Sequence, residues 1–285
     1  MSEKINFYKN LQPFLDCKDY TVSGENYQIK KNSEFDMLVT TPVPKNLSNY
    51  YKSEDYISHT DSRKSLFDKI YQFVKKISLN KKLQLINSFY SPSKNILDIG
   101  AGTGDFLNFC QLNSWNVFGV EPSEKARNIA SKKGIELKEN INLFQNKKFD
   151  VITLWHVLEH VENLSEYIHL LSNLLSDNGR LVIAVPNYKS YDAHYYKEFW
   201  AAFDVPRHLW HFSKSSIDKL FSLVDMSIEE IKPMKFDSYY VALLSEKYKN
   251  KKMNLFKIFF NGFYSNLKAT QTNEYSSLIY VLKKN

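Results

Sequence analysis

Hydrophobic runs alternate with segments of helical periodicity from about residue 91 to the C-terminus. Stretches of helix length separate four strand-like runs: NILDI, WNVFGVE, FDVITL and GRLVIAVP. Farther along, a closing antiparallel pair is predicted by MSIEEIKPMKF and SSLIYVLKK. This order predicts an α/β fold with βαβ units and a doubly wound, mostly parallel sheet.

The first 60 residues differ from the rest of the chain. They contain short alternating segments such as TVSGENYQIK, the turn sequence TTPVPK and a tyrosine-rich connector, NYYKSEDYISHT. We interpret residues 1–60 as a small appendage of short strands with a connector, and residues 61–285 as the main domain. The main domain begins with LFDKIYQFVKKI, whose apolar residues have helical spacing and predict a helix leading into the α/β core.

Composition limits the class of protein. A chain of 285 residues with 43% hydrophobic side chains can bury one large core. We find neither an N-terminal apolar h-region nor a run near the roughly 18 apolar residues that span a bilayer, so we expect a cytoplasmic protein. Cys17 and Cys110 are far apart and provide no CxxC zinc ligands, which fits a reducing compartment. The net charge of +7 comes from scattered lysines and selects no partner.

The segment NILDIGAGTGDFL carries the clearest chemistry. A dinucleotide fingerprint, G-x-G-x-x-G, would require a third glycine at position 105, where this chain has Asp105. The glycines are Gly100, Gly102 and Gly104, and Asp98 closes the preceding strand. A carboxylate at that place suits a ligand carrying an ammonium and a sulfonium better than a pyrophosphate. The loop therefore favours S-adenosylmethionine over a nicotinamide dinucleotide.

Other residues complete the predicted cofactor site. The backbone at Gly100, Ala101 and Gly102 can approach the methionyl portion closely, and the following helix offers N–H groups to its carboxylate. Glu121 ends the next strand, where an acidic side chain can accept both ribose hydroxyls. Pro122 follows and is placed to lie against the adenine.

The segments LDIGAGTGDF, GVEPS, FDVITLWHVLEHV and GRLVIAVPN, in this order, resemble the class I S-adenosylmethionine-dependent methyltransferases over about residues 94–187. The resemblance implies a Rossmann-like sheet of seven strands with one antiparallel strand near the C-terminus. It implies that Trp155 and His156 line the cofactor pocket and that the adenine is read within LKENIN, at the end of the third strand. Residues 91–187 would then form the cofactor half, and residues 188–285 the acceptor side.

His156, Glu159 and His160 spell H-x-x-E-H, an inverted zinc-protease signature. The context argues against a protease, because the motif begins where a buried strand ends. Some ubiquinone-pathway O-methyltransferases, which this segment resembles, have an acidic residue at the position of His156 and use the trio for a divalent metal. The spacing permits such a site. We nevertheless expect no metal, with Glu159 and His160 hydrogen-bonding the helix start and nearby loops.

The segment FWAAFDVPRHLWHFS resembles D-x-P-R-H-x-x-H-F-S segments in a branch of these methyltransferases that acts on small molecules. That resemblance implies that it faces the acceptor pocket. His208 or His211 is then the candidate base, Asp204 orients it, and Arg207 holds an acidic acceptor group. The alternative is an ordering network, in which Asp204 and Arg207 pair and the histidines cap the helix that begins near Ser213.

Three further segments surround the predicted acceptor side. FDSYYVALLSEKY is expected near the pocket, with Asp237 and Tyr240 as polar candidates for binding the substrate. KKMNLFKIFFNGFYSNLKA has phenylalanines at helical spacing, and we expect this stripe to be packed; a lid or contact with an anionic membrane are the alternatives. In the connector, Tyr56 and His59 are candidates for closing over the cofactor, and packing on the surface is an equal alternative.

The sequence thus predicts an S-adenosylmethionine-dependent methyltransferase that releases S-adenosylhomocysteine and acts on a small molecule, at oxygen. No N-P-P-Y type tetrad follows a strand, and basic and aromatic residues are not concentrated in one segment, which disfavours a macromolecular substrate. We therefore expect no nucleic-acid partner and at most peripheral membrane contact. A non-catalytic cofactor-binding module is the alternative function, and the oligomeric state is left open.

Overall fold

The computed structural model describes residues 5–51, 66–250 and 254–285. Tyr56 and His59, the connector residues predicted to close over the cofactor, lie outside these ranges. The predicted helix that leads into the core is present as α2 (Leu66–Asn87). Among the described residues, no helix is both long and apolar enough to cross a membrane.

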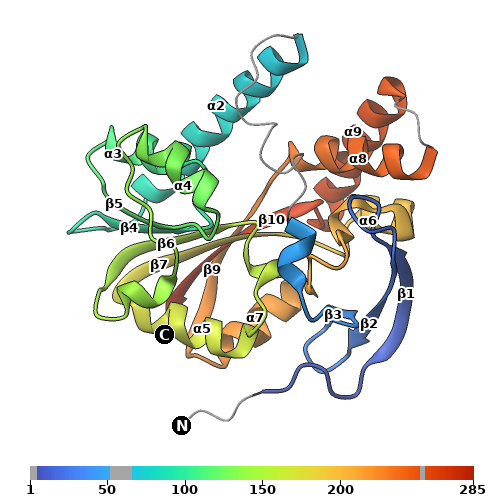
Figure 1. Cartoon of the computed structure of the whole chain (residues 1–285), viewed down its shortest axis with the longest axis horizontal. Helices are drawn as coiled ribbons and strands as arrows, with labels where there is room; N and C mark the ends of the chain where they lie inside the picture. The colour runs from blue at the N-terminus through green and yellow to red at the C-terminus, as the bar shows by residue number, and fades with distance from the viewer. Residues whose placement is uncertain (1–4, 52–65, 251–253) are drawn as a thin grey trace.

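A six-stranded mixed sheet forms the centre of the main domain, in the order β5-β4-β6-β7-β10-β9 (Figure 1). Strands β4 to β7 pair in parallel, and β10 runs antiparallel to both β7 and β9. The predicted mostly parallel sheet with an antiparallel C-terminal strand is therefore present. The strands are β4 (Asn95–Ile99), β5 (Asn116–Val120), β6 (Phe149–Trp155), β7 (Leu175–Pro186), β9 (Met226–Pro233) and β10 (Ser277–Lys284).

The predicted seventh strand is not formed in the described residues. LKENIN lies beside the edge strand β5, but its only ladder contact is an isolated parallel bridge between Val120 and Lys138. Lys138 and the two residues after it are exposed, so extending the ladder beyond this bridge would bury none of these three side chains. The Asn140 side chain then accepts a hydrogen bond from the Asn142 N–H and starts the short helix η2 (Ile141–Phe144), which turns the chain away from the sheet.

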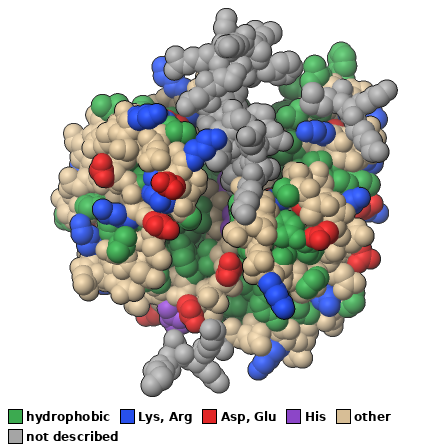
Figure 2. Space-filling view, viewed as in Figure 1, with side chains coloured by type: hydrophobic (Ala, Val, Ile, Leu, Met, Phe, Trp, Pro, Cys, Tyr) green, Lys and Arg blue, Asp and Glu red, His purple; other side chains and the backbone are tan. Residues whose placement is uncertain are grey.

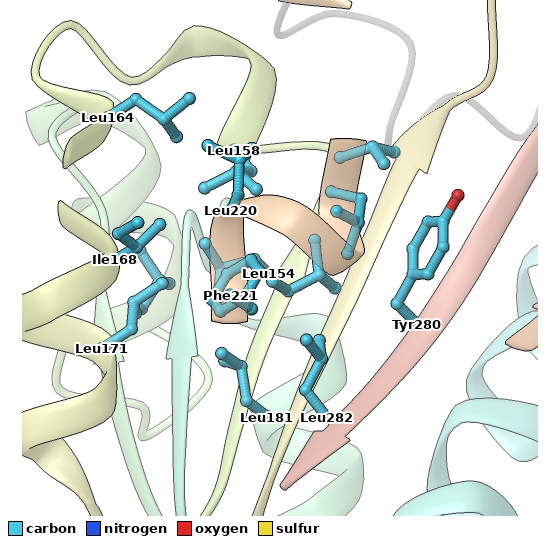
Figure 3. Packing of buried hydrophobic residues seen from close by; sticks show 14 of the residues in the cluster. Leu154, Leu158, Leu164, Ile168, Leu171, Leu181, Leu220, Phe221, Tyr280 and Leu282 are labelled. Atoms are coloured by element: carbon cyan, nitrogen blue, oxygen red, sulfur yellow. The ribbon is translucent and has the colours of Figure 1, made fainter. Parts of the chain in front are cut away.

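Helices cover both faces of the sheet, as a doubly wound fold requires. On one face, residues of α2, α3 and α4 pack against alternate strand residues such as Val151 and Val182. On the other face, α5 and α7 pack against the intervening residues, including Leu154 and Leu181 (Figure 3). The helices are α3 (Asp105–Gln111), α4 (Glu124–Ser131), α5 (Leu164–Leu174), α6 (Tyr191–Tyr196), α7 (Lys214–Ser222), α8 (Asp237–Asn250) and α9 (Leu255–Thr272), with the short η1 (Leu47–Tyr51), η3 (Leu158–His160), η4 (Lys197–Phe199) and η5 (Ala201–Phe203).

The N-terminal strands form a second, antiparallel sheet that includes a strand from the main domain. β1 (Gln12–Lys18), β2 (Asn26–Asn32) and β3 (Met37–Thr41) pair in order, and β3 then pairs with β8 (Trp210–His211). Met37 and Val39 join the same buried cluster as the main sheet. The appendage is therefore packed into the main core through the segment that contains the predicted catalytic histidines.

A buried ion cluster ties this appendage to the same segment. The Arg207 guanidinium, 3% exposed, donates to Asp204 at 2.6 and 2.9 Å and to Asp19 Oδ1 at 3.2 Å. Burial alone would raise the pKa of Asp19. Hydrogen bonds from the loop residues Ser23 and Thr21, together with the charge of Arg207, outweigh burial and lower that pKa. Asp19 is therefore held as a carboxylate in the interior.

The apolar stripe of α9 departs from the packed arrangement expected from its sequence. Its phenylalanines are exposed, with Phe256 at 90% and Phe259 at 65%. The helix instead buries a face of smaller residues, on which Gly262 lies against the Tyr239 side chain of α8 and Ser265 donates to Asp192. Close packing against α8 and a buried hydrogen bond determine which face of α9 is turned inward. The spacing of apolar residues, on which the prediction depends, does not contain this information.

Replacing Arg207 with Met should lower the free energy of unfolding by about 3–5 kcal/mol, because the buried Asp19 and the partly buried Asp204 lose their cation. Arg180→Met is the matched control, since Arg180 pairs with Glu229 near the surface and its loss should cost no more than about 1 kcal/mol. Urea denaturation of both variants measures the difference. Equal losses in the two variants would contradict a structural role for the buried cluster.

Candidate cofactor and acceptor site

The glycine loop lies at the carboxyl end of β4, where ligands bind in open α/β sheets. Gly100, Gly102 and Gly104 all have positive φ, between 55° and 74°. A Cβ at Gly100 would meet Val157 Cγ2 at 2.5 Å, and a Cβ at Gly104 would meet Ala130 Cβ at 2.9 Å. A Cβ at Gly102 would meet no atom within 4 Å. Gly102 therefore lies beside open space.

Glu121 is held directly on this loop. Its Oε2 accepts from the Gly102 N–H at 2.9 Å, and its Oε1 accepts from the Ser123 N–H at 2.9 Å. Two backbone donors thus orient the carboxylate beside the open space. Ala101 donates its N–H to the carbonyl of Val120, and Pro122 follows Glu121 on the surface. The predicted loop and ribose-binding residues are therefore brought together.

Asp98 lies behind the loop and is 2% exposed. Its Oδ1 accepts a 2.6 Å hydrogen bond from Thr153 Oγ1 on the neighbouring strand β6. Burial raises the pKa of Asp98 to about 7, although the Thr153 hydrogen bond and the charge of Lys82 oppose this shift. At neutral pH the carboxyl group is close to half ionised, so a cation bound nearby would favour the ionised form.

Lys82 of α2 is a residue of this site that the sequence analysis missed. Its Nζ lies 4.0 Å from the centre of the Trp155 ring, and burial lowers the pKa of Lys82 to about 8 against the opposing charge of Asp98. Trp155 Nε1 is buried and has no hydrogen-bond partner among the described residues. A signal was present in the sequence, because Lys82 interrupts the apolar helical stripe that contains Leu79 and Ile86.

His156 follows β6 with a left-handed backbone, φ 58°. Its Nδ1 lies 3.3 Å from Glu159 Oε1, and its Nε2 lies 3.0 Å from Asp237 Oδ2 at the start of α8. Burial disfavours the charged ring, but hydrogen bonds to Asp237 and Glu159 outweigh it and raise the pKa of His156 to about 10. The ring is therefore an imidazolium at neutral pH and donates to two carboxylates. Tyr240, one turn farther along α8, is 57% exposed.

The predicted catalytic histidines lie inside the protein. His208 is 9% exposed, and its Nδ1 lies 2.8 Å from the Ala202 carbonyl. His211 is 4% exposed; its Nε2 lies 3.0 Å from Thr40 Oγ1, which itself donates to the His208 carbonyl. Burial, and then the neighbouring His208, lowers the pKa of His211 well below its ordinary value.

In the rest of this segment, Asp204 and Arg207 pair as the ordering alternative expects, but the histidines do not cap the helix that follows. Asp204 and Arg207 pair with each other in the buried ion cluster. Helix α7 is capped by Ser213 in a reciprocal arrangement with Ser216, without a histidine. The hydrogen bonds of Arg207 are therefore directed to groups of this chain rather than to an open pocket.

Gly102→Ala should weaken binding of S-adenosylhomocysteine by at least about tenfold while the chain stays folded, because the new methyl group enters the open space of the loop. Gly134→Ala is the matched control: Gly134 has φ 78° and the same empty surroundings. Both variants bear about 1 kcal/mol of backbone strain. Calorimetric titration of both measures the affinity, and equal weakening would contradict a ligand at Gly102.

Curated relatives share part of the chain. An uncharacterized methyltransferase of Bacillus pumilus is 29% identical over 113 residues, which cover 35% of this chain and 51% of the relative. A ubiquinone biosynthesis O-methyltransferase of Rickettsia felis is 27% identical over 177 residues, covering 56% of this chain and 72% of the relative. The chain thus spans about half to three quarters of the length of these relatives.

Solved structures share the fold. The magnesium protoporphyrin IX methyltransferase of Synechocystis with bound S-adenosylhomocysteine superposes with a TM-score of 0.55 and 14% identity, over 85% of this chain and 100% of that one. The plantazolicin methyltransferase BpumL, also with S-adenosylhomocysteine, gives a TM-score of 0.51 and 21% identity, over 84% and 94% of the two chains. Both structures contain the product form of the cofactor predicted from the glycine loop.

A family model described as a methyltransferase domain matches residues 56–231, which is more than half of the chain. This range contains the glycine loop, Glu121 and the segment from His156 to His211. This match confirms the predicted methyltransferase class, and solved structures that share the fold hold S-adenosylhomocysteine. The chain belongs to this family of methyltransferase domains.

Proposed function

We propose that this protein transfers a methyl group from S-adenosylmethionine to an oxygen atom of a small-molecule acceptor. The observation that carries the proposal is the hydrogen-bonded pair of His156 and Asp237, beside the glycine loop and at the carboxyl edge of the sheet. The name of the Rickettsia felis relative, a ubiquinone biosynthesis O-methyltransferase, supports oxygen as the methylated atom. The small-molecule names of the structural neighbours support the acceptor class.

The residues around Gly102 fit the cofactor. Glu121 would accept the ribose hydroxyls, because its carboxylate is already oriented by two backbone donors beside the open space. Asp98 would favour the positive charge of the methionyl portion. When bound, S-adenosylmethionine supplies a methyl group activated by its sulfonium. The chain then has to orient the acceptor and remove its proton.

Asp237 is our candidate for accepting that proton. Its side chain is 24% exposed, and its Oδ2 accepts from His156 Nε2. His156 carries a proton on each ring nitrogen at neutral pH, so it cannot itself act as the base; it holds the Asp237 carboxylate in place. Tyr240 lies one helical turn from Asp237 and is exposed, which suits a contact with the acceptor. We do not assign the base to His208 or His211, because both are buried and hydrogen-bonded within the chain.

Asp237→Asn should lower kcat by about a hundredfold or more and leave the affinity for S-adenosylhomocysteine unchanged, because only proton removal is lost. Asp218→Asn, an exposed carboxylate on α7, is the control. Formation of S-adenosylhomocysteine is followed with a panel of phenols and catechols as acceptors. Full turnover by Asp237→Asn would exclude Asp237 as the base, and cofactor binding without turnover on any acceptor would favour a non-catalytic module.

Affinity for S-adenosylhomocysteine should fall as the pH drops below about 7, by up to about tenfold per pH unit. The pKa of Asp98 is raised to about 7, so below that pH the carboxyl group is neutral and attracts the ammonium of the ligand less. Lys82 and Glu121 are the other charged groups that act on Asp98, and Lys82, whose pKa is lowered by burial to about 8, is charged at both pH values. Calorimetry at pH 6 and 7 measures the change. An equal decline in Asp98→Asn would assign the effect to another group.

A further inference from the structure

We propose that Glu159, His160 and His208 bind a divalent metal ion of the zinc type. One ligand atom from each residue lies within 4.8 Å of the other two. Two imidazoles and one carboxylate are a ligand set found at protein zinc sites. This set differs from the sequence trio H-x-x-E-H, because His156 is directed toward Asp237 and the third ligand comes from His208, in a different segment.

Hydrogen bonds leave the same nitrogen available on both histidines. His160 Nδ1 lies 3.0 Å from the Arg207 carbonyl, and His208 Nδ1 lies 2.8 Å from the Ala202 carbonyl. A carbonyl oxygen only accepts, so each Nδ1 carries a proton, and Nε2 is the nitrogen of each ring that remains to bind a ligand. Metal-binding histidines are commonly oriented in this way by a backbone carbonyl on the other nitrogen. The rings are edge-to-face, with centroids 4.5 Å apart.

Glu159 supplies the observation that points to a missing ligand. Its side chain is 1% exposed, and Oε1 is paired with His156. Oε2 is buried and has no hydrogen-bond partner in the described part of the chain. A carboxylate oxygen left in this state is costly, because burial has removed its water and provided no donor. A bound cation would satisfy Oε2 and both imidazole lone pairs together.

The surrounding backbone holds the three residues in register. Glu159 and His160 lie in η3, directly after β6, and the Leu209 N–H donates to the Glu159 carbonyl at 2.8 Å. The buried pair of Arg207 with Asp204 fixes the other segment. Ligand atoms around a tetrahedral zinc ion are about 3.4 Å apart, given bonds of about 2.1 Å. The ligand atoms, within 4.8 Å of one another, would therefore have to approach one another to bind an ion.

Two further groups approach the histidines of this site. Asp204 Oδ2 lies 4.0 Å from His208 Nε2 and is the nearest further carboxylate. Tyr51 contacts His160 Nδ1 from the N-terminal appendage at 3.1 Å. Because imidazole nitrogens prefer zinc and cobalt to magnesium, the site should discriminate against Mg²⁺. Since the test is metal binding itself, it is independent of the proposed acceptor chemistry.

The test uses the full chain, stripped of metal with a chelator and titrated calorimetrically with Zn²⁺, Co²⁺ and Mg²⁺. We expect one equivalent of Zn²⁺ to bind, Co²⁺ to give the visible absorption of a four- or five-coordinate site, and Mg²⁺ not to bind. Glu159→Gln and His208→Gln should each weaken Zn²⁺ binding by about a hundredfold. His194→Gln is the matched control, because His194 Nδ1 also lies on a backbone carbonyl, that of Ser190, but the residue is exposed and outside the cluster.

Circular dichroism establishes that each variant is folded. If either ligand variant fails to fold, the wild-type chain still decides the matter through the Co²⁺ spectrum and through an increase in Tm with Zn²⁺ but not with Mg²⁺. Zn²⁺ binding that is unchanged in both folded ligand variants would overturn the proposal. It would also be overturned by a wild-type chain that binds no Zn²⁺.

Discussion

The buried guanidinium of Arg207 is the interaction on which the rest of the structure depends. It neutralises the buried Asp19 of the N-terminal appendage and the partly buried Asp204 of the segment that follows η5. Separating these two distant parts of the chain would leave a buried charge without a partner, which is strongly destabilising. The ion cluster therefore holds the two parts together. The same segment provides β8 to the N-terminal sheet and His208 to the cluster with Glu159. The appendage is therefore part of the framework of the site.

Charge at the carboxyl edge of the sheet is arranged in two neighbouring groups. Asp98 and Glu121 lie around the glycine loop and favour a ligand with a positive charge. His156 stands between Asp237 and Glu159 as an imidazolium, so one cation of the protein orients two carboxylates. The face seen in Figure 2 shows lysine and arginine side chains scattered among acidic ones, in keeping with a net charge that selects no partner.

The sequence predicted those features of the fold and the site that depend on the local pattern of residues. Apolar runs identified the parallel strands and β10, and the glycine spacing identified the cofactor class. It failed where tertiary contacts decide: LKENIN forms only an isolated bridge to β5, and α9 turns its small residues inward toward α8. Pairs such as His156 with Asp237, 81 residues apart, leave no trace in local periodicity. The pairing of Asp204 with Arg207 was one of two alternatives drawn from the sequence, whereas the burial of His208 was not predicted.

The most direct test of the central claim, that the glycine loop holds S-adenosylmethionine, is calorimetric titration of the purified chain with S-adenosylhomocysteine and, separately, with NADH. The open space at Gly102 and the carboxylates of Asp98 and Glu121 predict that S-adenosylhomocysteine binds at least about a hundredfold more tightly than NADH. Equal affinity, or a preference for NADH, would contradict the assignment of the loop and the placement of the acceptor site beside it.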